Sequence, residues 1–90
     1  MKEKDFENIV KAICTDVADM LIKKNKCYGN SALEPINCVY KGDAGTSIKV
    51  RIDDKLSRIM RGSEFQGDDT IWDLIGYLVL LLVSKAAAKQ

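Results

Sequence analysis

Apolar side chains recur every three or four residues along three stretches of this 90-residue chain, and such spacing lines one face of a helix. The first stretch predicts a helix over residues 5–24, with Asp5 as a candidate N-cap. Its apolar face is formed by Phe6, Ile9, Val10, Ile13, Val17, Met20 and Leu21.

The second stretch predicts a helix over residues 47–61. Thr46 or Ser47 is its candidate N-cap, and Gly62 is a suitable C-cap because glycine adopts the left-handed conformation readily. Alternating apolar residues at its start are also typical of a strand, which leaves the first turn open: Ile48, Val50 and Ile52.

The third helix is predicted to start after Asp68 or Asp69 as N-cap and to end near residue 85. Apolar residues lie on nearly every side of this helix, which indicates that it is buried on several sides. The run at residues 74–83 is much shorter than the roughly 20 residues of a membrane span, so we expect a core helix and no membrane contact. The sequence therefore predicts one all-α domain, residues 1–90, whose second and third helices form an antiparallel hairpin.

The connection between the first two helices is rich in Asn, Gly and Pro and predicts turns. Within it, residues 36–40 fit either a helical turn or a brief strand. The three cysteines have no zinc-type spacing and the chain has no histidine. We expect free thiols and a cytoplasmic protein without a signal peptide, with a Cys27–Cys38 disulfide as the open alternative.

Positive and negative charges nearly balance, with a formal net charge of +1, which argues against a duplex nucleic-acid partner. The chain is 47% hydrophobic and 30% charged, so it can build a core and stay in solution. Because a chain of this size buries only a modest share of its surface, we expect a homo-oligomer.

Basic side chains gather on the second predicted helix, where residues 49–61 hold five basic and two acidic residues. Guanidinium groups bind phosphate oxygens in pairs, and lysine adds a point charge, so this face predicts a phosphate site. Its alternative is a solvated face in which Asp54 pairs with Arg58 one turn away. The candidate phosphate ligands are Arg51, Lys55, Arg58, Arg61 and Lys26.

Two aspartates, Asp69 and Asp73, are four residues apart and share a helix face with Tyr77. Carboxylates on one face can hold Mg²⁺, which in turn gathers phosphate oxygens. The alternatives are an N-cap role for Asp69 and, for Asp73, a salt bridge to a basic residue of the second helix.

The turn after the first helix carries Tyr28 and Asn30 beside a glycine. An aromatic ring and an amide could stack on a nucleotide base and bind its edge. The alternative is an ordinary helix-ending turn with the tyrosine packed on the core.

Taken together, the segments KNKCYGNSALEP, IKVRIDDKLSRI and DDTIWDLIGYLVLL resemble a family of small phage and bacterial proteins, the nucleotide-modification-associated domain family. That family is similar to the MazG-like all-α nucleotide pyrophosphohydrolases. The resemblance implies a helical homo-oligomer with a nucleotide-derived ligand near subunit contacts. It also implies that Asp54, Asp69 and Asp73 are the positions nearest the acidic magnesium cluster.

The chain departs from the MazG pattern of Glu-x-x-Glu on one helix and Glu-x-x-Asp on the next. Arg51 and Asp54 stand at the two positions of the Glu-x-x-Glu pair. Thr70 stands three residues before Asp73, where the second pattern has a glutamate. We therefore expect a phage-type protein of the host cytoplasm that binds a phosphorylated nucleotide, for example to sequester a cyclic signal used in host defence. The alternatives are a Mg²⁺-dependent (d)NTP pyrophosphohydrolase and a purely structural helical oligomer.

Overall fold

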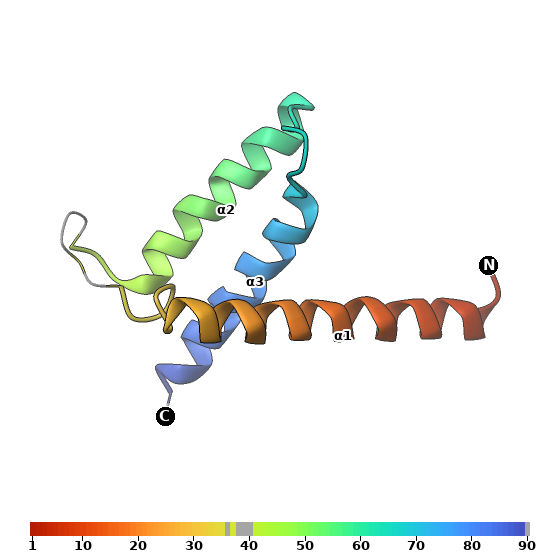
Figure 1. Cartoon of the computed structure of the whole chain (residues 1–90), viewed down its shortest axis with the longest axis horizontal. Coiled ribbons are helices and arrows are strands. Elements are labelled where there is room, and N and C mark those ends of the chain that lie inside the picture. Colours follow the sequence, from red (N-terminus) through yellow and green to blue (C-terminus); the bar gives the residue numbers. More distant parts are fainter. Residues whose placement is uncertain (36, 38–40, 90) are drawn as a thin grey trace.

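The computed structural model describes residues 1–35, 37 and 41–89 of the chain, and these form three helices and no strand. Helix α1 spans Glu3–Tyr28, α2 spans Ala44–Arg61 and α3 spans Thr70–Ala87 (Figure 1). The predicted all-α class is confirmed. The question of a turn or strand at residues 36–40 falls, apart from Asn37, outside the described residues.

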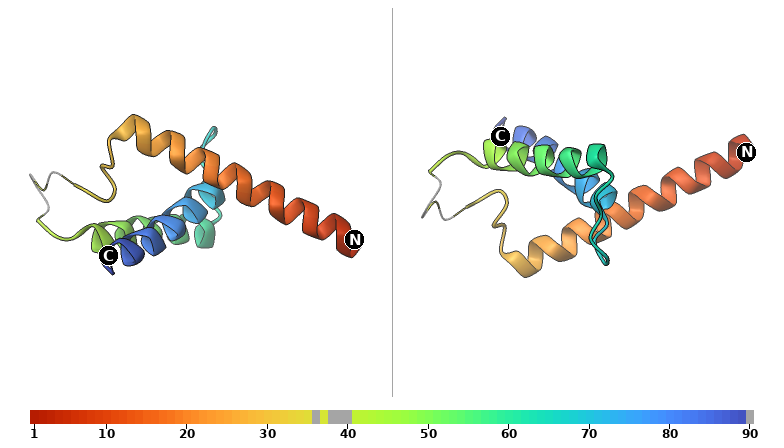
Figure 2. Two further views of the ribbon diagram at one scale, coloured as in Figure 1. Left: turned by 90° about the horizontal axis from the view of Figure 1, so that it is seen from below. Right: turned by 90° about the horizontal axis from the view of Figure 1, so that it is seen from above.

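Helices α2 and α3 run antiparallel and lie side by side, as both views in Figure 2 show, so the predicted hairpin is confirmed. The connection between them starts at Gly62, whose φ of 67° is left-handed and therefore suits a residue without a Cβ. Gly62 is the C-cap, as predicted, and its backbone N–H bonds to the carbonyl of Ile59.

Helix α2 begins three residues earlier than predicted, because Asp43 and not Thr46 or Ser47 is its N-cap. The Thr46 backbone N–H donates to Asp43 Oδ1 at 2.7 Å, and the Thr46 hydroxyl donates to Oδ2 at 3.0 Å. These bonds satisfy a free donor of the first turn. The backbone N–H of Thr46 is also the main cause that lowers the pKa of the Asp43 carboxyl.

Helix α1 is longer than predicted at both ends. It begins at Glu3, and its N-cap, Lys2, makes no side-chain cap hydrogen bond. The prediction of Asp5 as N-cap is therefore wrong, and its carboxylate lies in the first turn, where negative charge complements the helix dipole. The helix ends where Gly29 adopts a left-handed φ of 58°.

The core lies where α1 crosses the hairpin. Gly76 of α3 is buried against α1: a Cβ added there would meet Leu21 Cδ2 at 3.4 Å and Met20 Cε at 3.5 Å. Val17 of α1 and Ile48 of α2 are the buried apolar residues of the described chain. The first half of α1 extends beyond the hairpin (Figures 1 and 2).

Helix α3 is less buried in the single chain than its composition predicts. Of its residues only Thr70 and Gly76 are buried, while apolar side chains such as Leu78 and Leu82 stay exposed. The prediction of burial on several sides is therefore wrong for one copy of the chain. By length and composition alone, α3 is also the one helix of the described residues that could cross a membrane, a test that core helices of soluble proteins pass too.

Candidate functional site

A cleft of about 680 Å³ opens between the C-terminal part of α1, the turn that follows it, and the hairpin. Its apolar lining includes Ile48, Gly76 and Leu80. Polar and aromatic groups from all three helices line its walls: Lys24, Asn25, Tyr28, Arg51, Asp73 and Tyr77. Such a mixture of apolar surface and a few convergent polar groups is typical of small-molecule sites.

Arg51 contributes a positively charged side chain to the lining of the cleft. Its guanidinium carbon lies 5.8 Å from the centroid of the Tyr77 ring on the neighbouring helix, which is cation–π geometry. Among the described residues Arg51 forms no ion pair within 4 Å, so its positive charge is not neutralised by a carboxylate. An anion that enters the cleft would therefore meet an available guanidinium group.

Asp73 lines the same cleft but already has a basic partner. Its Oδ2 lies 3.6 Å from Nζ of Lys55, and Lys55 is also 3.9 Å from Asp54. Asp73 thus forms a salt bridge to a basic residue of the second helix, which was one alternative considered for it. Lys55 itself does not line the cleft, and its charge is paired with these two carboxylates.

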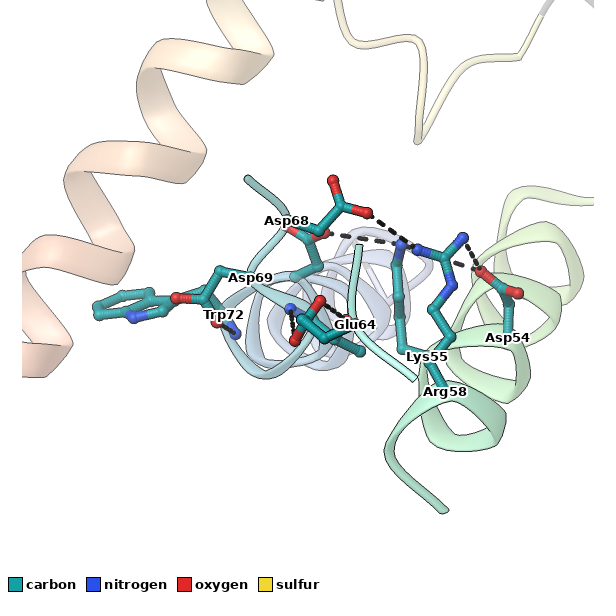
Figure 3. A network of polar contacts seen from close by, with 9 residues as sticks. Asp54, Lys55, Arg58, Glu64, Asp68, Asp69 and Trp72 are labelled. Atoms are coloured by element: carbon teal, nitrogen blue, oxygen red, sulfur yellow. Dashed lines mark hydrogen bonds and ion pairs between the residues drawn. The ribbon is translucent and has the colours of Figure 1, made fainter. Parts of the chain in front are cut away.

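Arg58 faces the loop between the hairpin helices rather than the cleft. Its guanidinium lies 3.1 Å from Asp54 and 3.5 Å from Asp68. Figure 3 shows Arg58 between these two carboxylates. The expected one-turn pairing of Asp54 with Arg58 is therefore present. Arg61 is exposed at the end of α2 and is not part of the cleft lining. Of the predicted phosphate ligands on α2, only Arg51 meets the cleft.

The same loop is held to α3 by a partly buried hydrogen bond. The hydroxyl of Thr70 donates to Glu64 Oε1 at 2.6 Å, and its backbone N–H is 3.4 Å from Oε2. Asp69 accepts the backbone N–H of Trp72 at 3.1 Å (Figure 3). Asp69 is thus the N-cap of α3, which is the structural alternative considered for it.

The three aspartates expected near a magnesium ion lie in different surroundings. Asp54 pairs with Lys55 and Arg58, Asp69 caps α3, and Asp73 faces the cleft. Within the described ranges no three His, Cys, Asp or Glu side chains are grouped so as to hold a metal ion. The geometry therefore gives no support to a magnesium site built from these residues.

Tyr28, the last residue of α1, lines the cleft, but its predicted neighbours Lys26 and Asn30 do not. Asn30 has a left-handed φ of 63°, and its Oδ1 accepts a hydrogen bond from the side-chain amide of Asn25. Lys26 is exposed outside the cleft. Lys24 and Asn25, which the sequence had not singled out, line it instead. The sequence could have indicated Lys24 as a cleft residue, because it lies four residues before Tyr28 and residues at this spacing share a helix face.

Cys14 and Cys27 are exposed free thiols. Cys38 falls outside the described residues, and so does the question of its pairing with Cys27.

No protein family model, curated protein or solved structure matches this chain. The resemblance to the nucleotide-modification-associated domain family therefore stays a prediction, and the function has to be argued from the cleft itself.

Proposed function

We propose that the chain binds a small phosphorylated nucleotide in the cleft between α1 and the hairpin. The observation that supports this most is the guanidinium of Arg51, which carries no carboxylate partner within the described chain and lies beside the ring of Tyr77. Cation and aromatic ring together offer partners for the two halves of a nucleotide, its phosphate and its base.

The phosphate would bind at Arg51, with Lys24 across the cleft as a second cation. Tyr28 and Tyr77 give the base two aromatic side chains on which to stack. The cleft volume of about 680 Å³ is within the range of roughly 300–1,000 Å³ common for small-ligand sites. Asp73 could accept hydrogen bonds from amino or hydroxyl groups of the ligand.

Binding without hydrolysis has the better support of the two nucleotide-directed functions. Hydrolysis by two metal ions needs a cluster of carboxylates, and the described residues hold no group of three metal-ligating side chains. Two of the expected phosphate ligands, Lys55 and Arg58, are already paired with aspartates. These pairs are what the purely structural alternative would predict, so the test must separate all three functions.

A calorimetric titration with linear and cyclic mono- and dinucleotides tests the proposal, with Arg61→Ala as the matched control for Arg51→Ala. Charge-assisted hydrogen bonds contribute about 1.5–3 kcal/mol, so we expect Arg51→Ala to weaken binding about tenfold or more. Arg61→Ala should bind as the wild type does. Absence of binding by every nucleotide would contradict the proposal and leave the structural alternative.

Catalysis is tested on the same samples. After incubation with Mg²⁺, we expect the bound nucleotide to be recovered unchanged from the denatured protein. Release of pyrophosphate or phosphate that disappears in Asp73→Asn would show hydrolysis instead and would identify Asp73 as part of its machinery.

A further inference from the structure

Two neighbouring contacts join α2 to α3 beside the cleft. Lys55 pairs with Asp73 at 3.6 Å, and the guanidinium carbon of Arg51 lies 5.8 Å from the ring centroid of Tyr77. On α2, Arg51 lies four residues before Lys55. On α3, Tyr77 lies four residues after Asp73. Residues at this spacing are neighbours on one helix face, about 5–6 Å apart at Cβ, so the two contacts are adjacent along the antiparallel hairpin.

Asp73 and Arg51 both line the cleft, yet they form no ion pair within 4 Å. A guanidinium group can bind a carboxylate through two parallel hydrogen bonds, which makes arginine a strong partner for aspartate. Asp73 is nevertheless paired with Lys55, which is mostly buried and is not part of the cleft lining. This pairing leaves the charge of Arg51 available to a ligand.

The second carboxylate beside Lys55 has another partner. Asp54 lies 3.9 Å from Lys55 but only 3.1 Å from Arg58. Asp73, by contrast, forms no ion pair with any described residue other than Lys55. If the charge of Lys55 were removed, Asp73 would therefore be the carboxylate left without a cation.

We propose that Lys55 is a positioning residue of the nucleotide site, which keeps Asp73 from pairing with Arg51 and offsets the charge of that carboxylate. This role rests on the proposed function, in which the guanidinium of Arg51 receives the phosphate. Without the lysine charge, Asp73 would turn to Arg51, its neighbour in the cleft lining, and a phosphate would have to displace it. The unbalanced carboxylate would also repel the phosphate. Both effects weaken binding, although Lys55 does not line the cleft.

Calorimetric titration with a nucleotide that binds the wild type tests this role. Lys55→Met removes the charge but keeps a long side chain, and it should bind about three- to tenfold more weakly. Asp73→Asn removes the negative charge but keeps an acceptor oxygen, and it should bind at least as tightly as the wild type. The double variant should recover most of the lost affinity. Lys49→Met, the matched control at an exposed lysine of α2 outside the cleft lining, should bind as the wild type does.

A salt bridge that only stabilises the fold predicts a different pattern. Lys55→Met and Asp73→Asn would then break the same contact, so both would weaken binding, and the double variant would bind no better than either. That pattern, or equal affinities for Lys55→Met and Lys49→Met, would overturn the positioning role while nucleotide binding by the wild type stands. Circular dichroism identifies the variants that are folded, and Lys55→Gln replaces Lys55→Met if the latter is not.

The reactivity of Arg51 tests the same relationship without any ligand. Phenylglyoxal modifies guanidinium groups, and a carboxylate paired with the guanidinium slows the reaction. Mass spectrometry should show slower modification of Arg51 in Lys55→Met than in the wild type, and recovery in the double variant with Asp73→Asn. Arg61, exposed at the end of α2, is the internal control and should react equally in all samples.

The two measurements separate this inference from the proposed function. If the Arg51 rates follow this pattern but the wild type binds no nucleotide, the proposed function fails and the control of Arg51 by Lys55 stands. Equal Arg51 rates in the wild type and in the folded Lys55 variant would overturn the inference, whether or not a nucleotide binds.

Discussion

Lys55 Nζ lies 3.6 Å from Asp73 Oδ2 and thereby links the middle of α2 to the first turn of α3. The lysine is only 13% exposed, and its alkyl stem is covered by the hairpin, while Asp73 stays in contact with the cleft. A carboxylate in an otherwise apolar helix is thus satisfied by a cation from the adjacent helix.

This link predicts that Lys55→Ala destabilises the fold by about 1–2 kcal/mol, because it removes both an ion pair and the packing of the stem. Urea unfolding followed by circular dichroism measures the loss. Lys49→Ala, at an exposed lysine of the same helix, should change the free energy of unfolding by less than about 0.5 kcal/mol. Equal losses in the two variants would mean that the salt bridge contributes nothing.

The hydrogen bond from Thr70 to Glu64 predicts a second stability effect. Thr70 is 2% exposed, and its hydroxyl donates to the carboxylate at 2.6 Å. Thr70→Val keeps the shape but removes the donor, so we expect a loss of about 1 kcal/mol or more in urea unfolding. Ser63→Ala, in the same exposed loop, should have little effect. Unchanged stability in Thr70→Val would show that water replaces the bond without cost.

Gly76 predicts opposite effects for small and large side chains. An alanine Cβ would be in ordinary contact with Leu21 and Met20, and alanine favours helix by about 0.5–1 kcal/mol over glycine. Gly76→Ala should therefore be neutral or stabilising. Gly76→Leu should cost about 1–3 kcal/mol, because its extra atoms force α1 away from α3. Thermal unfolding of both variants checks this contrast, and a stabilised leucine variant would contradict it.

The N-cap of α2 predicts how stability depends on pH. Hydrogen bonds from Thr46 lower the pKa of the Asp43 carboxyl in the folded chain. The ionised cap therefore stabilises the fold above the pKa of the unfolded chain, near 3.9, and this contribution is lost as the pH falls through the lower folded value. Comparing wild type with Asp43→Ala in urea at pH 7 and pH 2.5 should show a difference that is largest at pH 7. A difference that does not shrink at acid pH would contradict this assignment.

The contact of Arg51 with Tyr77 predicts graded effects on nucleotide affinity. Tyr77→Phe keeps an aromatic face at 5.8 Å from the guanidinium, whereas Tyr77→Leu removes it. The cation–π contact holds the guanidinium in place with about 0.5–1 kcal/mol before a ligand enters. Without it Arg51 has to be ordered on binding, so the leucine variant should bind about two- to fivefold more weakly and the phenylalanine variant nearly as well as wild type. Equal affinities for the leucine and phenylalanine variants would show that the ring takes no part.

The helices could be predicted from the sequence because apolar periodicity and capping residues are local signals. Gly62 was found for that reason, and Asp69 was one of the two N-caps considered for α3. The start of α2 was missed because Asp43, Thr46 and Ser47 are all good caps, and only geometry chooses among them.

The candidate site was only partly predictable. The spacing along a helix shows which residues share a face, but it does not show which part of the chain that face contacts. Arg51 and Tyr77 meet in the cleft, whereas Arg58 is two turns further along α2 and pairs with the loop residue Asp68. Lys24 was missed because the end of α1 explains a lysine equally well through the helix dipole.

Helix α1 lines the cleft along its C-terminal part, from Met20 to Tyr28, and residues 3–13 extend beyond the hairpin at its other end (Figure 2). A continuous helix of 26 residues is a stiff rod about 39 Å long. Leu21 and Met20, which lie against Gly76 of α3, also line the cleft. A tilt of this rod about that contact would move its two ends in opposite directions, so the width of the cleft at Tyr28 and the direction of residues 3–13 are geometrically tied to each other.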